Sequence, residues 1–183
     1  DGDAIFFVCD REKAAAEFAG KARDTICDEM GLRETNVYKF CWVVDFPMYE
    51  RDDKTGELDF SHNPFSMPQG GIEALSADDP ETILAHQYDC TCNGVELCSG
   101  AIRNHETATM ERAFELVGYD PSLVQQKFPA LYEAFQYGVP PHGGCAFGVD
   151  RIVMLLNGET NLRQVNAFVM NGAYEDLTMG APS

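Results

Sequence analysis

The chain has 183 residues, of which 45% are hydrophobic, enough for a compact domain with a core. Thirty acidic against thirteen basic side chains leave a formal charge of -17, whereas proteins that grip nucleic-acid phosphates are basic. No apolar run approaches the ~18 residues that a membrane span needs. The first residues carry neither a basic leader nor a cleavage site, so we expect no membrane span and no secretion.

The N-terminal part reads as a strand followed by a helix. Residues 1–10, DGDAIFFVCD, predict the strand, and the alanine-rich residues 11–30 predict a helix that stops at Gly31. We expect both to pack against a part of the protein outside this pair.

A strand-rich run and two loops follow. Residues 37–50 predict β-structure ended by Pro47, and the acidic residues 51–60 predict a loop with a Lys-Thr-Gly turn. Residues 61–71, SHNPFSMPQGG, hold two prolines and two glycines, which excludes regular structure. His62 in this loop either fills a turn or belongs to a site, because loops carry functional residues more often than their share.

Residues 88–104, YDCTCNGVELCSGAIRN, predict a β-hairpin that turns at Asn93-Gly94. With a two-residue turn, position 92 faces 95, 91 faces 96, 90 faces 97 and 89 faces 98. Asp89 and Glu96 then lie on one face as diagonal neighbours, within about 8 Å. Like charges so placed repel, so these carboxylates either form a solvated outer face or hold a divalent cation.

The register of the hairpin also decides on which face Arg103 lies. Strict alternation of side chains would put it on the face opposite Glu96. Ser99-Gly100 predicts a β-bulge, and one extra residue would turn Arg103 to the side of the acids.

The seven cysteines are odd in number and scattered, which favours reduced thiols in a reducing compartment over a disulfide framework. In the predicted register Cys90 and Cys92 share one face and Cys98 lies on the other. No fourth ligand converges with them, so half-buried thiols are favoured over a zinc site.

The C-terminal part predicts three helices. Residues 105–118 and 120–138 read as amphipathic helices, with Asp120 capping the second. In residues 139–158, VPPHGGCAFGVDRIVMLLNG, a glycine-rich strand runs into a helix that begins near Asp150. Arg151 in its first turn opposes the helix dipole, so either a bound anion or a salt bridge with a neighbouring acid is required. Hairpin strands with helices attached between them predict an α+β fold around a mainly antiparallel sheet.

The stretch GGCAFGVDRIVMLL resembles the third signature motif of class II aminoacyl-tRNA synthetases, a Gly-x-Ala-x-Gly-x-Asp-Arg strand and helix. In order and spacing, DFPMYE, SHNPFSMP, YDCTCNGVELCSGAIRNH, YGVPPHGGCAFGVDR and the terminal MGAPS are similar to the bacterial type of aspartyl-tRNA synthetase. The resemblance covers essentially the whole chain. It implies a class II antiparallel sheet, which is incomplete in this chain. It also implies an enzyme that activates aspartate with ATP and Mg²⁺ and then transfers the aspartate to the tRNA terminus.

The resemblance implies nucleotide-binding roles for three residues. Asp89 and Glu96 match the acids that hold ATP-bound Mg²⁺. Arg151 matches the motif arginine on the terminal phosphate of ATP, so Arg151 and Glu96 are the expected catalytic residues. Because ATP carries about four negative charges, carboxylates beside it would repel it unless a divalent cation bridges them.

It also implies an amino-acid pocket. Arg103 matches the arginine that pairs with the aspartate side chain, for which its planar guanidinium is suited. His62 matches a loop histidine that approaches the bound amino acid, and Ser99 and Gly100 line the same pocket.

For domain organisation, the resemblance implies that residues 1–36 are the tail of an inserted domain and residues 37–183 the second half of the catalytic domain, including motif 3. The anticodon-binding domain and motifs 1 and 2 would precede residue 1. We therefore expect the chain by itself to be inactive and to meet tRNA through those other domains. Exposed strand edges would require the missing half or other protein subunits, so we do not expect a monomer.

Three functions stay open. The first is the C-terminal catalytic part of an aspartate-tRNA ligase, and the second is a synthetase-derived structural or accessory subunit of a larger assembly. The third, less favoured, is a small module that binds an amino acid or a nucleotide. The retained charges of Asp89, Glu96, Arg103 and Arg151 favour the first, whereas the missing motifs and cysteine-rich strands favour the second. The predicted location is the cytoplasm, or an organelle matrix or stroma.

Overall fold

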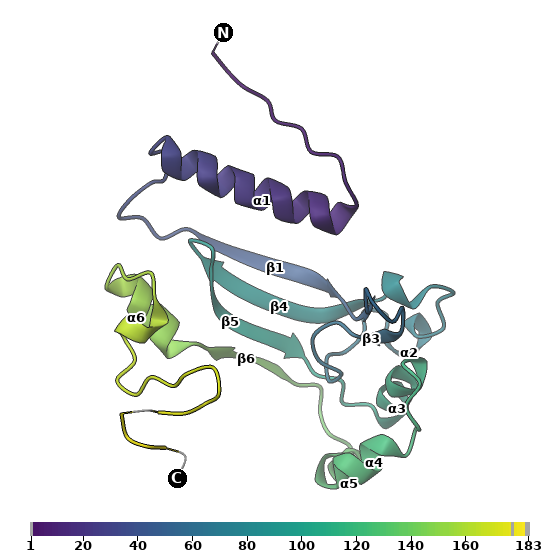
Figure 1. The fold of residues 1–183 in the computed structure, drawn as a ribbon. Helices are drawn as coiled ribbons and strands as arrows, with labels where there is room; N and C mark the ends of the chain where they lie inside the picture. The colour runs from purple at the N-terminus through teal and green to yellow at the C-terminus, as the bar shows by residue number, and fades with distance from the viewer. Residues whose placement is uncertain (1, 177, 182–183) are drawn as a thin grey trace. The chain divides into compact units, whose positions relative to one another are not determined.

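A computed structural model describes residues 2–176 and 178–181 (Figure 1). The first residue of the predicted N-terminal strand and the last two residues of the MGAPS motif lie outside the described residues. The chain divides into two compact units, Asp1–Tyr38 and Lys39–Ser183, and each is described by itself. The assignment of residues 1–36 to an inserted domain stays a prediction.

The first unit contains the predicted helix but not the predicted strand. Helix α1 (Glu12–Glu29) ends before Gly31, whose φ of 64° is the left-handed conformation typical of helix ends. Residues 2–10 have no regular secondary structure, so the strand prediction is wrong. A strand needs a neighbour for its N–H and C=O groups, and residues 2–38 contain no other strand.

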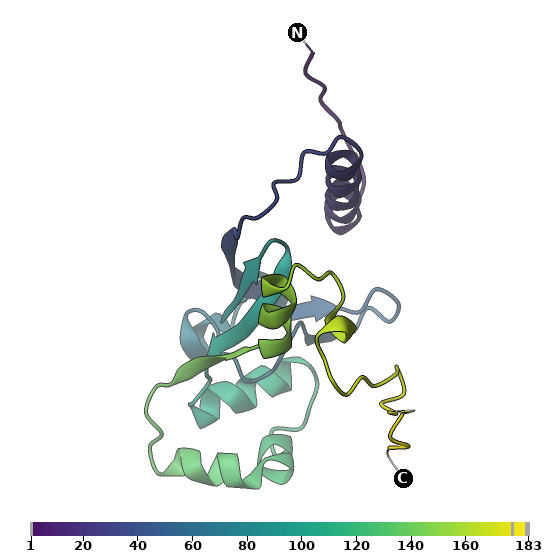
Figure 2. The same ribbon diagram turned by 90° about the vertical axis from the view of Figure 1, so that its left-hand side faces the viewer.

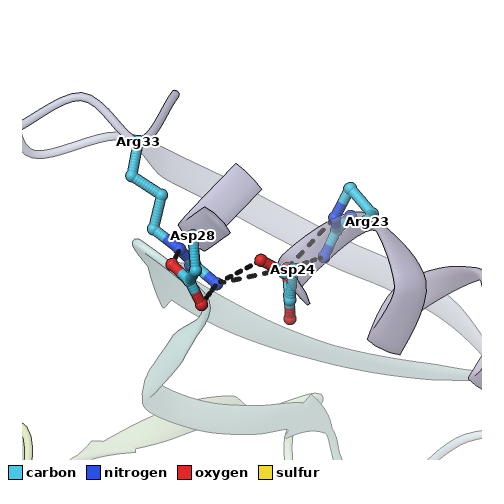
Figure 3. Close-up of polar contacts among 4 residues, drawn as sticks. All are labelled: Arg23, Asp24, Asp28 and Arg33. Carbon is cyan, nitrogen blue, oxygen red and sulfur yellow. Dashed lines mark hydrogen bonds and ion pairs between the residues drawn. The ribbon is translucent and has the colours of Figure 1, made fainter. Parts of the chain in front are cut away.

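Charged side chains link the last turns of α1 to the segment that follows it (Figure 3). The Arg33 guanidinium binds the Asp28 carboxylate, with 3.0 Å between Nη2 and Oδ2, and this contact raises the pKa of Arg33. Arg23 lies 3.1 Å from Asp24, which is 3.7 Å from Arg33. These side chains are 51–73% exposed, so screening by water and salt leaves the pairs little effect on stability.

The second unit is built on an antiparallel sheet with the strand order β1-β4-β5-β6 (Figure 1). Its strands are β1 (Phe40–Pro47), β4 (Leu84–Cys92), β5 (Val95–Ile102) and β6 (Gly143–Phe147). The β4–β5 hairpin turns at Asn93-Gly94, where φ angles of 51° and 80° fit the turn type that such a sequence favours. The predicted α+β fold with an antiparallel sheet is confirmed.

A small second hairpin pairs β2 (Tyr49–Arg51) with β3 (Leu58–Phe60), the latter within a segment predicted as loop. Both strands contribute to a hydrophobic core cluster, with Tyr49 buried in it and Leu58 and Phe60 packed against it. The buried residues of this core cluster are Met48, Tyr49, Leu75, Ile83, Ala85 and Ala113. The Tyr49 hydroxyl donates to the Ala113 carbonyl at 3.1 Å, and burial raises the pKa of Tyr49.

The helices of this unit are α2 (Gly71–Ala74), α3 (Thr107–Leu116), α4 (Leu123–Lys127), α5 (Pro129–Gln136) and α6 (Val149–Leu156), with short 3-10 turns at Pro80–Thr82 and Leu162–Gln164. Figure 2 shows β6 running between the loop after α5 and the start of α6. The prediction of one helix over residues 120–138 is wrong, because Pro129 separates α4 from α5. Proline lacks the N–H that would continue α4, and it excludes Phe128 from helical geometry, here φ -129° and ψ 53°. No described helix has the length and apolar character to cross a membrane.

Candidate functional site

A β-bulge at Leu97 sets the geometry of the site. Thr91 pairs with Glu96, as the two-residue turn predicts, but the next residue of β4, Cys90, pairs with Cys98. Leu97 is therefore the extra residue, and it and Cys98 are 7% and 1% exposed. A bulge at Leu97 allows both Leu97 and the adjacent Cys98 to be buried. This favours its position, because the register of a strand decides which side chains reach the core.

The bulge gathers the predicted site residues on one face of the sheet. Beyond it Asp89 pairs with Ser99, and alternation from there places Ser99, Ala101 and Arg103 on the face that carries Asp89 and Glu96. We call this the pocket face. The expectation that a bulge turns Arg103 towards the acids is confirmed, but its predicted position further along β5 is wrong, since that stretch is regularly paired.

A cavity of about 470 Å³ opens where β5 meets β6 on the pocket face. Small residues leave room for it, and its lining includes Asn63, Ser99, Gly100, Ala101, Arg103, His142, Gly144 and Ala146. The structure therefore brings together Ser99, Gly100 and Arg103, as the sequence predicts.

His62 does not line this cavity. Its side chain is exposed, and its ring packs edge-on against Phe46 with 4.9 Å between centroids. The neighbouring Asn63 forms part of the cavity wall instead. A role for His62 near the amino acid stays a prediction.

Arg103 is the cationic group of the cavity. Its guanidinium carbon lies over the Phe65 ring, 5.5 Å from the centroid. Its backbone is held on both sides: its N–H donates to the His142 carbonyl at 2.9 Å, and Ser66 faces it in a β-bridge. Within residues 2–176 and 178–181 no carboxylate forms an ion pair with Arg103. A half-buried guanidinium that no described carboxylate neutralises is suited to bind an anion.

Asp89 lies in the middle of the sheet, between Val43 of β1 and Ser99 of β5. Its Oδ1 is buried and has no hydrogen-bond partner among the residues that the structure describes. Because a buried carboxylate oxygen is costly without a donor or a cation, this atom is a candidate ligand oxygen.

Arg151 in the first turn of α6 forms an ion pair with Glu96, with 3.1 Å between Nη1 and Oε1. The same nitrogen donates to the Glu96 carbonyl at 2.8 Å. Of the two explanations for an arginine at this position, the structure shows the salt bridge. Both side chains are nearly half exposed, so the pair is screened and free to exchange for a ligand.

The opposite face of the sheet carries Cys90, Cys92, Cys98 and Cys145. Cys90 and Cys98 are directly paired there, so the prediction that they lie on different faces is wrong, and the bulge is the reason. All seven cysteines are free thiols. Burial, reinforced by Cys98, raises the pKa of Cys90, and burial likewise raises that of Cys98. Among the described residues, no three His, Cys, Asp or Glu side chains are grouped so as to hold a metal by themselves.

These environments predict an order of thiol reactivity. In the native chain at pH 8, iodoacetamide should alkylate the exposed Cys9, Cys41 and Cys145 first, and Cys90 and Cys98 at least roughly tenfold more slowly, because the thiolate is the reactive form. A time course of peptide mass spectra measures the rates. If Cys98 reacts as fast as Cys145, the bulge at Leu97 is misplaced.

Sequence reasoning missed two residues of the cavity wall, Asn63 and His142. Asn63 could have been found, because Asn-Pro is typical of turns in which the Asn side chain binds the backbone, here Phe65 N–H at 3.0 Å. His142 gave no local signal. Behind the cavity, on the opposite face of the sheet, the Tyr88 hydroxyl crosses β5 to donate to the Gly144 carbonyl of β6 at 3.1 Å.

Comparison with known proteins agrees with this architecture. Residues 9–172 match the family described as tRNA synthetases class II (D, K and N). The match covers most of the chain, which therefore belongs to the class II tRNA synthetases.

Within that class, the chain is similar over its whole length to bacterial aspartate-tRNA(Asp/Asn) ligases. Identity is 60% with the enzyme of Beijerinckia indica and 57% with that of Gluconobacter oxydans. The chain spans 30% of the length of each of these relatives. The resemblance to the bacterial aspartyl type is thereby confirmed.

Two solved structures support the fold. The aspartyl tRNA synthetase from Entamoeba histolytica has a TM-score of 0.54 at 24% identity, over 96% of this chain and 29% of its own. The asparaginyl-tRNA synthetase of the same organism, in complex with asparaginyl-adenylate, has a TM-score of 0.50 at 22% identity, over 80% and 27% of the two chains. At these identities the likeness concerns the fold.

Proposed function

We propose that this chain forms part of the active site of an aspartate-tRNA ligase. The observation that carries the proposal is the Arg103 guanidinium, which lies in a cavity and has no carboxylate partner among the described residues. A guanidinium binds a carboxylate through two parallel hydrogen bonds, so Arg103 would pair with the side chain of aspartate. The names of the relatives at 57–60% identity support the same amino acid.

The acidic part of the pocket face fits ATP with Mg²⁺. Mg²⁺ is held by one or two carboxylates together with phosphate oxygens and water, and Asp89 and Glu96 supply two carboxylates on one face. The buried Asp89 Oδ1 without a donor supports this fit. Bound Mg²⁺ would offset the repulsion between the carboxylates and the phosphates. Arg151 would exchange its contact with Glu96 for the terminal phosphate.

In the proposed reaction, an oxygen of the aspartate α-carboxylate attacks the α-phosphorus of ATP. The bond between that phosphorus and the bridging oxygen breaks, and pyrophosphate leaves. A ribose hydroxyl at the tRNA terminus then attacks the activated carbonyl, and AMP leaves. Such steps need positioning and charge neutralisation, which Arg103, Glu96 and Arg151 would supply. Ser99 and Gly100 would shape the wall beside the amino acid.

The test is exchange of labelled pyrophosphate into ATP by the complete polypeptide that the gene encodes. We expect exchange that depends on aspartate, followed by charging of both tRNA-Asp and tRNA-Asn, since the relatives are named for both. A folded polypeptide that gives no aspartate-dependent exchange would contradict the proposal and favour the non-catalytic, accessory role.

A further inference from the structure

The loop that precedes α2 is fastened beside the end of β5. Met67 N–H donates to the Ile102 carbonyl at 2.8 Å, and Asn104 N–H donates to the Phe65 carbonyl at 2.8 Å. Between these two bonds, Ser66 faces Arg103 in a β-bridge. Backbone hydrogen bonds therefore set the spacing between Phe65 and Arg103, although the two residues are far apart in the sequence.

Asn63 holds the other end of this loop. Its Oδ1 accepts from Phe65 N–H at 3.0 Å and from the Ser66 hydroxyl at 3.2 Å, and its Nδ2 donates to Gln87 Oε1 at 3.3 Å. Ser66 and Gln87 are 0% and 7% exposed. Because breaking a buried network leaves polar groups without partners, the loop is held in one conformation.

The Phe65 ring is fixed by its neighbours as well. It packs edge-on against Phe128 at 5.1 Å and lies 6.4 Å from Phe114, between centroids. The face of the Phe65 ring contacts the Arg103 guanidinium, which lies over it. An aromatic face attracts a guanidinium without using any of its N–H donors, so these stay available to a ligand in the cavity.

We propose that Phe65 is a positioning residue that holds Arg103 in the orientation that receives the carboxylate of the amino acid. This inference rests on the proposed function and adds a determinant of specificity to it. Aspartate and asparagine have nearly the same shape and differ in charge. Discrimination between them therefore depends on where the guanidinium is held, and the ring together with the Asn63 loop holds it.

The experiment compares variants of the complete polypeptide by pyrophosphate exchange, with aspartate, asparagine and ATP titrated separately. In Phe65→Leu we expect KM for aspartate to rise roughly 3- to 30-fold, in line with the loss of a cation–π contact. KM for ATP should change less than about twofold, and the preference for aspartate over asparagine should fall with the rise in aspartate KM. Phe65→Tyr, which keeps the ring, should restore both values.

Phe60→Leu is the matched control, because it removes a half-buried ring that packs against Tyr49 and Phe114 and leaves Phe65, Phe128 and Arg103 in place. It should lower the melting temperature about as much as Phe65→Leu without changing the aspartate preference. Phe65→Met, whose unbranched and flexible side chain adapts to irregular gaps in a core, replaces the leucine variant if that variant does not fold.

The two hypotheses fail differently. No aspartate-dependent exchange by the unchanged polypeptide would overturn the proposed function and this inference with it. Exchange by the unchanged polypeptide, combined with an equal rise of KM for ATP and aspartate in Phe65→Leu, would overturn this inference and leave the function intact. An unchanged preference for aspartate in both Phe65→Leu and Phe65→Met would also overturn it.

Discussion

Replacing Arg103 by alanine is expected to abolish aspartate activation while ATP binding stays nearly unchanged. The substitution removes the cation of the cavity, so the aspartate side chain would be taken from water without an opposing charge. Loss of a preorganised charge contact of this kind lowers the rate by a hundredfold or more, about 3 kcal/mol. Exchange kinetics with aspartate titrated measure the loss in the complete polypeptide, and calorimetry measures ATP affinity.

Arg112→Ala provides the matched control for that experiment. Arg112 lies on α3, 41% exposed, and pairs with Glu115, so its loss removes the same charge from the surface. Its effect on exchange should be less than about twofold, since exposed pairs contribute little. Equal losses of aspartate and ATP binding in Arg103→Ala would show that Arg103 is not the aspartate-binding arginine.

Gly100→Ala is expected to destabilise the second unit by about 3 kcal/mol or more. A Cβ at this position would lie 2.4 Å from the Gly144 carbonyl oxygen, 2.6 Å from the Tyr88 ring and 2.7 Å from Cys145 Cβ. Tyr88 crosses directly over Gly100 to reach the Gly144 carbonyl, which explains why a hydrogen atom is required there. The melting temperature should fall by roughly 6–12 °C for a chain of this size.

Gly144→Ala is the control for this second prediction. The residue lies on the adjacent strand, and a Cβ there would have no heavy atom within 4 Å. Its effect on stability should stay within about 0.5 kcal/mol. Thermal unfolding followed by circular dichroism measures the stability of both variants. Equal losses of stability would mean that Tyr88 does not cover Gly100.

Sequence reasoning succeeded where the cause was local. Asn93-Gly94 specifies its hairpin turn because few other residues adopt positive φ twice in succession. The alanine-rich segment of α1 forms a helix that ends before Gly31 for the same kind of reason. The motif around Arg151 and the paired acids of the hairpin were sufficient to indicate the family, which the comparisons confirm.

The sequence by itself therefore determined the α+β class, the turn of the central hairpin, the family and the residue types of the pocket face. Only the tertiary structure decided that the bulge falls at Leu97, that Cys98 lies beside Cys90 and that Asn63 rather than His62 lines the cavity. Turn and helix preferences act within a few residues, so they are visible in the sequence. Bulge position and cavity lining depend on which side chains distant strands can bury, and that balance exists only once those strands have come together.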